Sequence, residues 1–123
     1  MNNYGLEFNK SNNYSDAIHY FSKAININPI YVNAYSKRGN VFDKMGETFL
    51  ENALIDFNMA LLLDPNHENT LFNRAMLFMK NAEFQKAIID FSRLVEINPN
   101  DFEAFSKRET CYAIINKIQA SIK

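Results

Sequence analysis

The sequence predicts an all-α fold built as an array of helix pairs, because one spacing recurs three times and the composition leaves no room for other elements. The three copies span 17–29, 53–65 and 87–99. Each copy begins with an alanine, carries a phenylalanine four positions later and closes with a proline, and the copies start at nearly even intervals. Such self-similarity is typical of helical repeats. The repeat frame accounts for nearly all of the three glycines and three prolines, so no stretch remains for a sheet or a long linker.

The other half of each unit carries a small residue followed three positions later by an aromatic residue. Glycine or alanine occupies positions 5, 39 and 75, phenylalanine follows each of them, and the frame continues as Glu109 and Tyr112. Together with Ala-x-x-x-Phe and the closing proline, this pattern resembles the tetratricopeptide repeat over essentially all 123 residues. The resemblance implies a right-handed α-solenoid of antiparallel helix pairs. Arginine stands at the usual leucine position of the repeat, at Arg38, Arg74 and Arg108.

The frame also predicts the domain organisation, which is a single array. Its units are approximately 1–31, 32–67 and 68–101, followed by a partial fourth unit or a capping helix at 102–123. The predicted helices span 1–10, 14–26, 32–45, 50–63, 68–80 and 84–97, and a further helix begins near 101. Helices end at the prolines, because proline lacks an N–H and disfavours the α conformation in the preceding residue. Two extra residues in the second unit predict a longer turn at 46–49.

Close helix contacts are predicted where the small residues of the frame meet. Ala53 and Ala87 have no side chain beyond Cβ, so the second helix of a pair can approach the first. We therefore expect both alanines to be buried. The frame begins and ends part-way through a unit, which leads us to expect a segment of a longer array; the alternative is a small protein that ends in one capping helix.

The residues offer little chemistry for catalysis or for metal binding. His19 and His67 fall in different units with no ligand set at metal spacing, and both are predicted to lie at the surface. No nucleophile elbow or phosphate-binding loop is present. Cys111 is predicted to be a small buried apolar side chain. We therefore predict no enzyme activity, no catalytic residue, no metal and no cofactor.

Charge and hydropathy bear on partners and location. Thirteen Lys and Arg residues stand against 14 Asp and Glu residues, and this balance argues against an RNA-reading groove that must neutralise phosphates. The basic pairs at 37–38 and 107–108 are predicted to be solvated. No run of 18 apolar residues occurs, and residues 1–4 lack the features of a signal peptide. We predict a cytoplasmic protein that binds no nucleic acid and does not insert into membranes.

The resemblance places a binding surface on the first helix of each unit, which lines the concave groove of such arrays. The positions that face a ligand correspond to Asn33, Ser36, Asn40, Asp43 and Lys44 in the second unit, and to Asn69, Phe72, Met76, Met79 and Lys80 in the third. The helix that begins near 101 adds Glu103, Ser106 and Thr110. Asparagine both donates and accepts, so these amides suit the backbone of a bound peptide. Phe72 and the two methionines would form an adaptable apolar pocket; ordinary packing between helices is the alternative.

The predicted function is a non-catalytic scaffold that binds a partner peptide or protein of unknown identity in this groove. Co-chaperones of the family grip a heat-shock protein C-terminus with two lysines, two asparagines and an arginine. Asn40 and Asn73 match the asparagines and Lys107 replaces the arginine, but Ser36 and Glu103 stand where lysines are expected. That clamp is incomplete, so co-chaperone activity is an alternative.

A second alternative is self-association into a homo-oligomer through the C-terminal helix. Four isoleucines in this helix have no following unit to cover all of them. They are Ile114, Ile115, Ile118 and Ile122.

Overall fold

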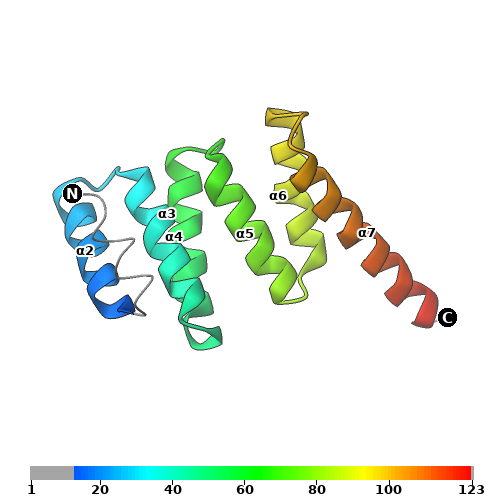
Figure 1. Ribbon diagram of the computed structural model, residues 1–123, viewed down its shortest axis with the longest axis horizontal. Helices are drawn as coiled ribbons and strands as arrows, with labels where there is room; N and C mark the ends of the chain where they lie inside the picture. The colour runs from blue at the N-terminus through cyan, green and yellow to red at the C-terminus, as the bar shows by residue number, and fades with distance from the viewer. Residues whose placement is uncertain (1–12, 123) are drawn as a thin grey trace. The chain divides into compact units, whose positions relative to one another are not determined.

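The computed structural model describes residues 13–122, and every regular element in that range is helical. The helices are α2 (Tyr14–Ile27), α3 (Val32–Lys44), η1 (Glu47–Phe49, a short 3-10 helix), α4 (Leu50–Leu63), α5 (Glu68–Lys80), α6 (Phe84–Ile97) and α7 (Phe102–Ile122) (Figure 1). Each predicted helix boundary in this range agrees to within one residue, which confirms the all-α fold. The helix predicted at 1–10 lies outside the described residues.

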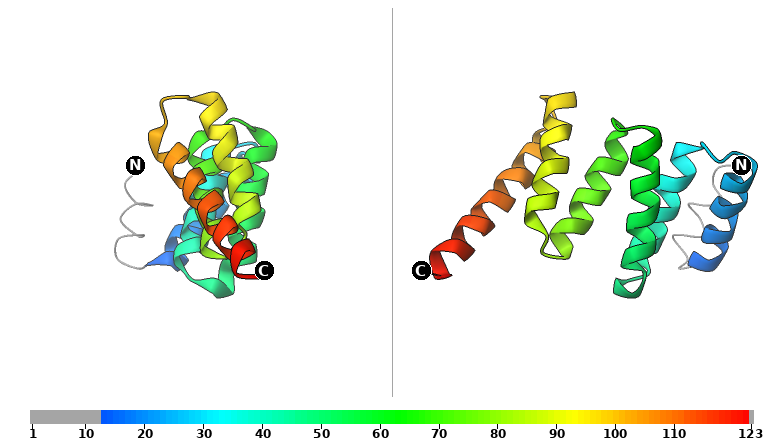
Figure 2. Two further views of the ribbon diagram at one scale, coloured as in Figure 1. Left: turned by 90° about the vertical axis from the view of Figure 1, so that its right-hand side faces the viewer. Right: turned by 180° about the vertical axis from the view of Figure 1, so that it is seen from behind.

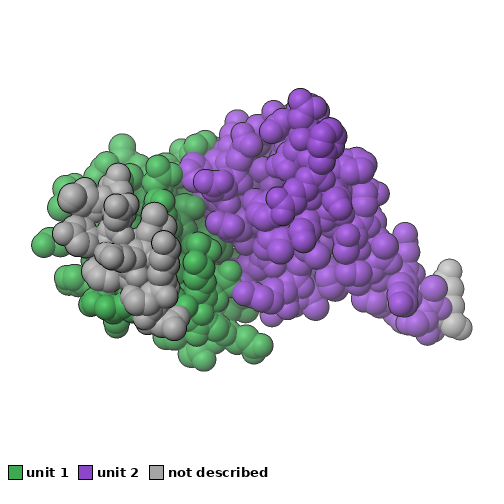
Figure 3. Space-filling model, viewed as in Figure 1, with its two compact units in different colours: residues 1–65 green, residues 66–123 purple. Residues whose placement is uncertain are grey.

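The chain divides into two compact units, residues 1–65 and 66–123 (Figure 3). In the first unit α3 packs against both α2 and α4. In the second, α6 packs against both α5 and α7 (Figure 2). The core of each unit therefore lies between successive helices of the repeat frame.

Small residues set the distance between α3 and α4 in the first unit. Ala53 and Phe57 on α4 are fully buried, and they lie against Gly39 on α3. A Cβ atom added at Gly39 would be 2.8 Å from the Cδ1 and Cε1 atoms of Phe57 and 3.2 Å from the carbonyl oxygen of Ala53. Ala87 is likewise fully buried in the second unit. The predicted burial of the two frame alanines is confirmed.

The longer turn predicted in the second repeat is present between α3 and α4. Gly46 has a φ of 107°, a backbone conformation that side chains other than hydrogen disfavour, and η1 follows it directly. The rings of Phe42 and Phe49 stack with their centroids 5.9 Å apart, which ties this turn to the end of α3. The two extra residues are therefore accommodated as one turn of 3-10 helix.

A buried ion pair joins the two helices of a repeat in each unit. In the first unit Arg38 on α3 donates from Nε and Nη2 to the two carboxylate oxygens of Asp56 on α4, both at 2.8 Å. In the second unit Arg74 on α5 makes the same two-point contact with Asp90 on α6, at 2.8 and 2.7 Å. The carboxylate side chains are only 3% exposed. Each pair therefore links its helices in one relative orientation.

This arrangement corrects the prediction of a solvated basic pair at 37–38 for Arg38 alone, since Lys37 is exposed as predicted. The Arg38 side chain is 21% exposed, and its hydrogen bond to Asp56 raises the pKa of the guanidinium above its ordinary value, against the opposing effect of burial. Two parallel N–H donors match a carboxylate in a way that a single ammonium group does not. The arginine at the usual leucine position of the repeat is thus a structural residue.

The contact at Gly39 predicts an effect whose size depends on Phe57. In the wild-type background, Gly39→Ala should destabilise the protein, because overpacking of about 1–3 kcal/mol exceeds the roughly 1 kcal/mol that alanine gains in helix propensity. In a Phe57→Leu background the ring atoms that crowd this position are gone and only the 3.2 Å contact with the Ala53 carbonyl oxygen remains, so the same substitution should destabilise the protein less. Urea denaturation of the four proteins measures both effects. An equal effect of Gly39→Ala in both backgrounds would show that the ring contact is unimportant.

The ion pair of the second unit predicts a larger loss. Asp90→Asn leaves Arg74 against a neutral amide in a mostly buried position, and we expect a loss of about 2–4 kcal/mol in the free energy of unfolding. Glu96→Gln is the matched control, because Glu96 pairs with Arg93 on the exposed side of α6, where such pairs contribute about 0–1 kcal/mol. Equal stability of the two variants in urea would contradict a structural role for the Asp90 pair.

Candidate peptide-binding site

A pocket of about 230 Å³ lies on the second unit, at the end of the helices where α5 and α7 begin. Seven residues from three helices and the loop before α7 line it: Glu68, Asn69, Phe72, Asn73, Leu94, Asp101 and Glu103. Four of these were predicted as positions that face a ligand: Asn69, Phe72 and Asn73 on α5, and Glu103 on α7. The pocket therefore brings together the first turns of α5 with the start of α7.

The helical repeat of α5 places the three predicted residues on one face. Positions separated by three and four residues are neighbours on a helix surface, and Asn69, Phe72 and Asn73 have this spacing. The side-chain amides of Asn69 and Asn73 form no hydrogen bond with any residue in 13–122. Asn69 is exposed and Asn73 half-buried. Both amides are therefore available to a ligand that enters the pocket.

Phe72 belongs both to the pocket and to the core. It is half-buried, and its ring meets the fully buried Phe91 ring edge to face, with centroids 5.8 Å apart. Leu94 lines the pocket from α6 but is only 1% exposed, so Phe72 is the main apolar group that a ligand can reach there. Phe72 therefore lines the pocket and also packs against the core, as each of the two predicted alternatives states.

The remaining pocket residues are acidic. Glu68, Asp101 and Glu103 contribute three carboxylates, and Asp101 also accepts a hydrogen bond from the backbone N–H of Ala104 at 3.1 Å, which caps α7. The predicted Lys107 is half-buried one turn beyond Glu103 and does not line the pocket. The potential inside the pocket is therefore negative.

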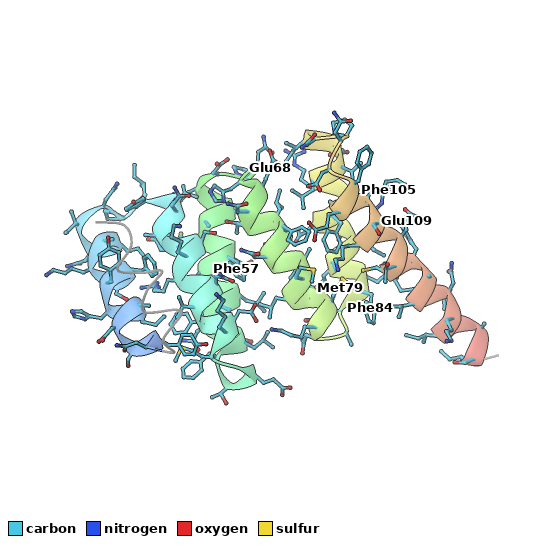
Figure 4. The ribbon with its side chains drawn as sticks, viewed as in Figure 1. Phe57, Glu68, Met79, Phe84, Phe105 and Glu109 are labelled. Carbon is cyan, nitrogen blue, oxygen red and sulfur yellow. The ribbon has the colours of Figure 1, made fainter. Side chains whose placement is uncertain are left out.

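The other predicted residues of α5 lie outside the pocket. Met76 and Met79 are half-buried and Lys80 is exposed. Figure 4 shows Glu68 and Met79 toward opposite ends of α5. Of Phe72 and the two methionines, only Phe72 lines the pocket described above, and the apolar pocket of all three side chains stays a prediction.

The binding residues predicted in the second repeat all lie on α3, which belongs to the compact unit 1–65. Asn33 and Lys44 are exposed, while Asn40 and Asp43 are half-buried. Ser36 is only 6% exposed, so a partner can reach little of its side chain. Four of the five positions thus present accessible polar groups.

The histidines and the cysteine are placed much as the sequence suggested. His19 is exposed, whereas His67 is half-buried, with its Nδ1 atom 2.7 Å from the Thr70 hydroxyl. Cys111 is fully buried, as predicted, and burial raises the pKa of its thiol. A buried thiol with a raised pKa is a poor nucleophile. Within residues 13–122 no group of three His, Cys, Asp or Glu residues is arranged to hold a metal ion.

None of the described helices is both long and apolar enough to span a bilayer.

Comparison with known proteins identifies the family. A profile described as "TPR repeat" matches residues 5–46, and one described as "Tetratricopeptide repeat" matches residues 69–101. The chain belongs to the tetratricopeptide-repeat family. A solved structure described as the first TPR of Spaghetti (RPAP3) bound to the HSP90 peptide SRMEEVD superposes with a TM-score of 0.82 at 20% identity, over 91% of this chain and 87% of that one. The fold of this tetratricopeptide-repeat chain is thus that of known TPR domains, which are α-solenoids.

Two curated relatives show how much of a longer protein such a segment can represent. The chain is 28% identical over 111 residues to serine/threonine-protein phosphatase 5 of Rattus norvegicus. The aligned region covers 90% of this chain and 22% of the relative. It is 27% identical over 113 residues to Hsp70-Hsp90 organizing protein 2 of Arabidopsis thaliana, and that aligned region covers 92% of this chain and 19% of the relative. The chain therefore spans about a fifth of the length of the relatives it matches.

Sequence reasoning missed Glu68, Leu94 and Asp101 as parts of the pocket. Asp101 follows Asn100, which comes directly after a proline, and an Asx residue at such a position caps a helix. That signal predicts the cap, but it does not predict that the cap faces the first turn of α5. Leu94 follows the helical spacing of the core and carries no separate signal.

Proposed function

We propose that this chain is a non-catalytic scaffold that binds a segment of a partner protein at the pocket of the second unit. The observation that carries the proposal is the pair of amides, Asn69 and Asn73, which line a pocket and have no hydrogen-bond partner within the described residues. A buried peptide group without a hydrogen bond costs about 1–3 kcal/mol. Two asparagine amides that donate and accept remove that cost for any sequence that presents its backbone here.

The apolar part of the pocket gives the partner segment a second kind of contact. The half-buried ring of Phe72 offers apolar surface in the same pocket as the amides. Removing apolar surface from water contributes about 25 cal/mol per Å². Together these contacts favour an extended or helical segment that places one apolar side chain in the pocket and its backbone beside the amides.

The comparisons support this kind of function without naming the partner. The solved RPAP3 domain is described as bound to an HSP90 peptide, and the Arabidopsis relative is named for organising Hsp70 and Hsp90. Those activities belong to the proteins so named. For this chain they support a protein-interaction scaffold, and we place it in the cytoplasm, where a lone cysteine such as Cys111 stays reduced.

The charge of the pocket argues against the co-chaperone alternative. The peptide SRMEEVD carries three acidic side chains and a terminal carboxylate, whereas the pocket presents Glu68, Asp101 and Glu103. Like charges at short distance repel. A partner segment that is neutral or basic at the pocket fits better than an acidic C-terminus.

The amides predict a loss of affinity without a loss of stability. A partner captured with the wild-type chain should bind the Asn69→Ala and Asn73→Ala variants more weakly by about 1–3 kcal/mol each, measured by calorimetry. Asn52→Ala on the exposed surface of α4 is the matched control and should bind as the wild type does. Wild-type affinity in the folded Asn69→Ala/Asn73→Ala double variant would exclude this pocket as the binding site.

The acidic pocket predicts a gain of affinity for an acidic peptide on charge reversal. Glu103→Lys places a cation where the clamp of the co-chaperones has a lysine, and a charge-assisted hydrogen bond contributes roughly 1.5–3 kcal/mol. We expect fluorescein-labelled SRMEEVD to bind Glu103→Lys about 10- to 100-fold more tightly than the wild type. Glu51→Lys, on the exposed surface of α4, changes the net charge equally and should not reproduce the gain. Tight binding of SRMEEVD to the wild type would support the co-chaperone alternative instead.

A further inference from the structure

The pocket of the second unit holds negative charge that no cation of the described chain neutralises. Three of its lining residues are Glu68, Asp101 and Glu103. Within residues 13–122 none of the three forms an ion pair. Arg74, which follows the pocket residue Asn73 in the sequence, already donates to both carboxylate oxygens of its aspartate on α6. A cation that enters the pocket therefore meets carboxylates whose charge is still unpaired.

The two exposed carboxylates of the pocket come from different helices. Glu68 begins α5, and Glu103 lies in the first turn of α7. Both residues are exposed, so their side chains can turn toward a ligand. Asp101 is engaged differently, because its carboxylate accepts the hydrogen bond that caps α7. Glu68 and Glu103 are thus the carboxylates that a ligand can approach from two sides.

Charge alone does not define the ligand, because acidic residues in the first turn of a helix also stabilise that helix through its dipole. The arrangement of side chains on α5 is more specific. Glu68 and Phe72 are four residues apart and form one row along the helix surface, and Asn69 and Asn73 form a second row beside it. The pocket therefore combines a carboxylate, an aromatic ring and two amides on adjacent rows of one helix.

Arginines of this chain already occupy surroundings of the same kind. The Cζ atom of Arg74 lies 5.7 Å from the centroid of the Phe78 ring, while its N–H groups bind Asp90. Arg38 combines a ring and an aspartate in the same way in the first unit. A guanidinium can lie over an aromatic face and donate to a carboxylate at the same time. The pocket has the ring and the carboxylates of such a site, but no described residue supplies the guanidinium.

We propose that the pocket binds an arginine side chain of the partner segment. This inference rests on the proposed function and names the side chain that enters the pocket. The methylene stem of the arginine is the apolar group that packs against Phe72, and its guanidinium reaches Glu68 and Glu103. Asn69 and Asn73 remain available to the backbone of the segment. The pocket volume of about 230 Å³ is below the roughly 300–1,000 Å³ of typical small-molecule sites, which agrees with one long side chain as the occupant.

Lysine is the competing occupant, and this chain shows how the two side chains differ. The Nζ atom of Lys86 lies 5.7 Å from the Phe78 centroid and 2.9 Å from a carboxylate oxygen of Glu83, but the lysine side chain is 61% exposed. The side chains of Arg38 and Arg74 are 21% and 22% exposed. An ammonium group is a compact, strongly hydrated charge, whereas a guanidinium is more weakly hydrated and carries five donors in one plane. Carboxylates that approach from two helices therefore favour arginine.

The test uses four peptides that differ at one residue. Each is acetylated and amidated and has the sequence GSAXASG, in which X is arginine, lysine, citrulline or glutamate; citrulline is the neutral isostere of arginine. Affinity is measured at millimolar peptide from the NMR signals of the Asn69 and Asn73 side-chain amides in the isotope-labelled full chain. The arginine peptide should bind at least about tenfold more tightly than the citrulline peptide, because charge-assisted hydrogen bonds are about twice as strong as neutral ones. It should bind at least about threefold more tightly than the lysine peptide, and the glutamate peptide should bind most weakly.

Charge-neutralised variants test which carboxylates are responsible. In the Glu68→Gln/Glu103→Gln double variant, the arginine and citrulline peptides should bind with affinities that agree within about twofold. The matched control is Glu96→Gln/Glu109→Gln, which changes the net charge equally at two exposed carboxylates of the same unit that do not line the pocket. This control should keep the preference for arginine over citrulline.

Three results would overturn the inference. The first is equal affinity of the wild type for the arginine and citrulline peptides; if both peptides also lose affinity in the Asn69→Ala/Asn73→Ala variant, the pocket binds a backbone without selecting arginine and the proposed function stands alone. The second is a preference for arginine that survives in Glu68→Gln/Glu103→Gln, which would place the guanidinium outside the pocket. The third is the absence of shifts at both amides for all four peptides, which would count against the proposed function as well.

Discussion

The bidentate contact between an arginine on one helix and a buried aspartate on the next organises both units of this protein. Asp56 and Asp90 are nearly inaccessible to water, and an unpaired buried carboxylate is strongly unfavourable. Only one relative placement of the two helices brings both carboxylate oxygens to Nε and Nη2 of the arginine. The apolar contacts around Phe57 and Phe91 supply most of the stabilisation, but many arrangements of phenylalanine and alanine bury similar area. The ion pair stabilises one of these arrangements relative to the others.

The helices were predictable because their signals are local and repeated. Alanine, phenylalanine and proline at fixed spacing determine where α2, α4 and α6 lie and where they end, and the extra residues before Ala53 give the longer turn. The Arg38–Asp56 pair was missed because its members are 18 residues apart and neither residue type is distinctive by itself. A sequence comparison of the copies contains the signal, since an aspartate precedes Phe57 and Phe91 and an arginine precedes Gly39 and Ala75.

The candidate site was predictable only in part, for a related reason. Asn69, Phe72 and Asn73 share one helix, so their common face follows from helical geometry. Asp101 and Leu94 reach the same pocket from the loop after α6 and from α6 itself, and that convergence depends on how three helices pack. The sign of the pocket's charge depends on this convergence, because Asp101 and Glu103 come from the start of α7. Residues that are far apart in sequence thus determine which peptides the pocket accepts.

The turn at Gly46 shows how the array tolerates a change in length. The second repeat is two residues longer than the third, yet the paired distances are 2.8 and 2.8 Å for Arg38–Asp56 and 2.8 and 2.7 Å for Arg74–Asp90. The added residues are taken up by η1 and by one glycine with positive φ, and none of the extra length reaches the paired helices. Insertions and deletions in this turn are therefore decoupled from the core. The tips of the helix pairs can lengthen or shorten in evolution while the contacts that hold each pair stay the same.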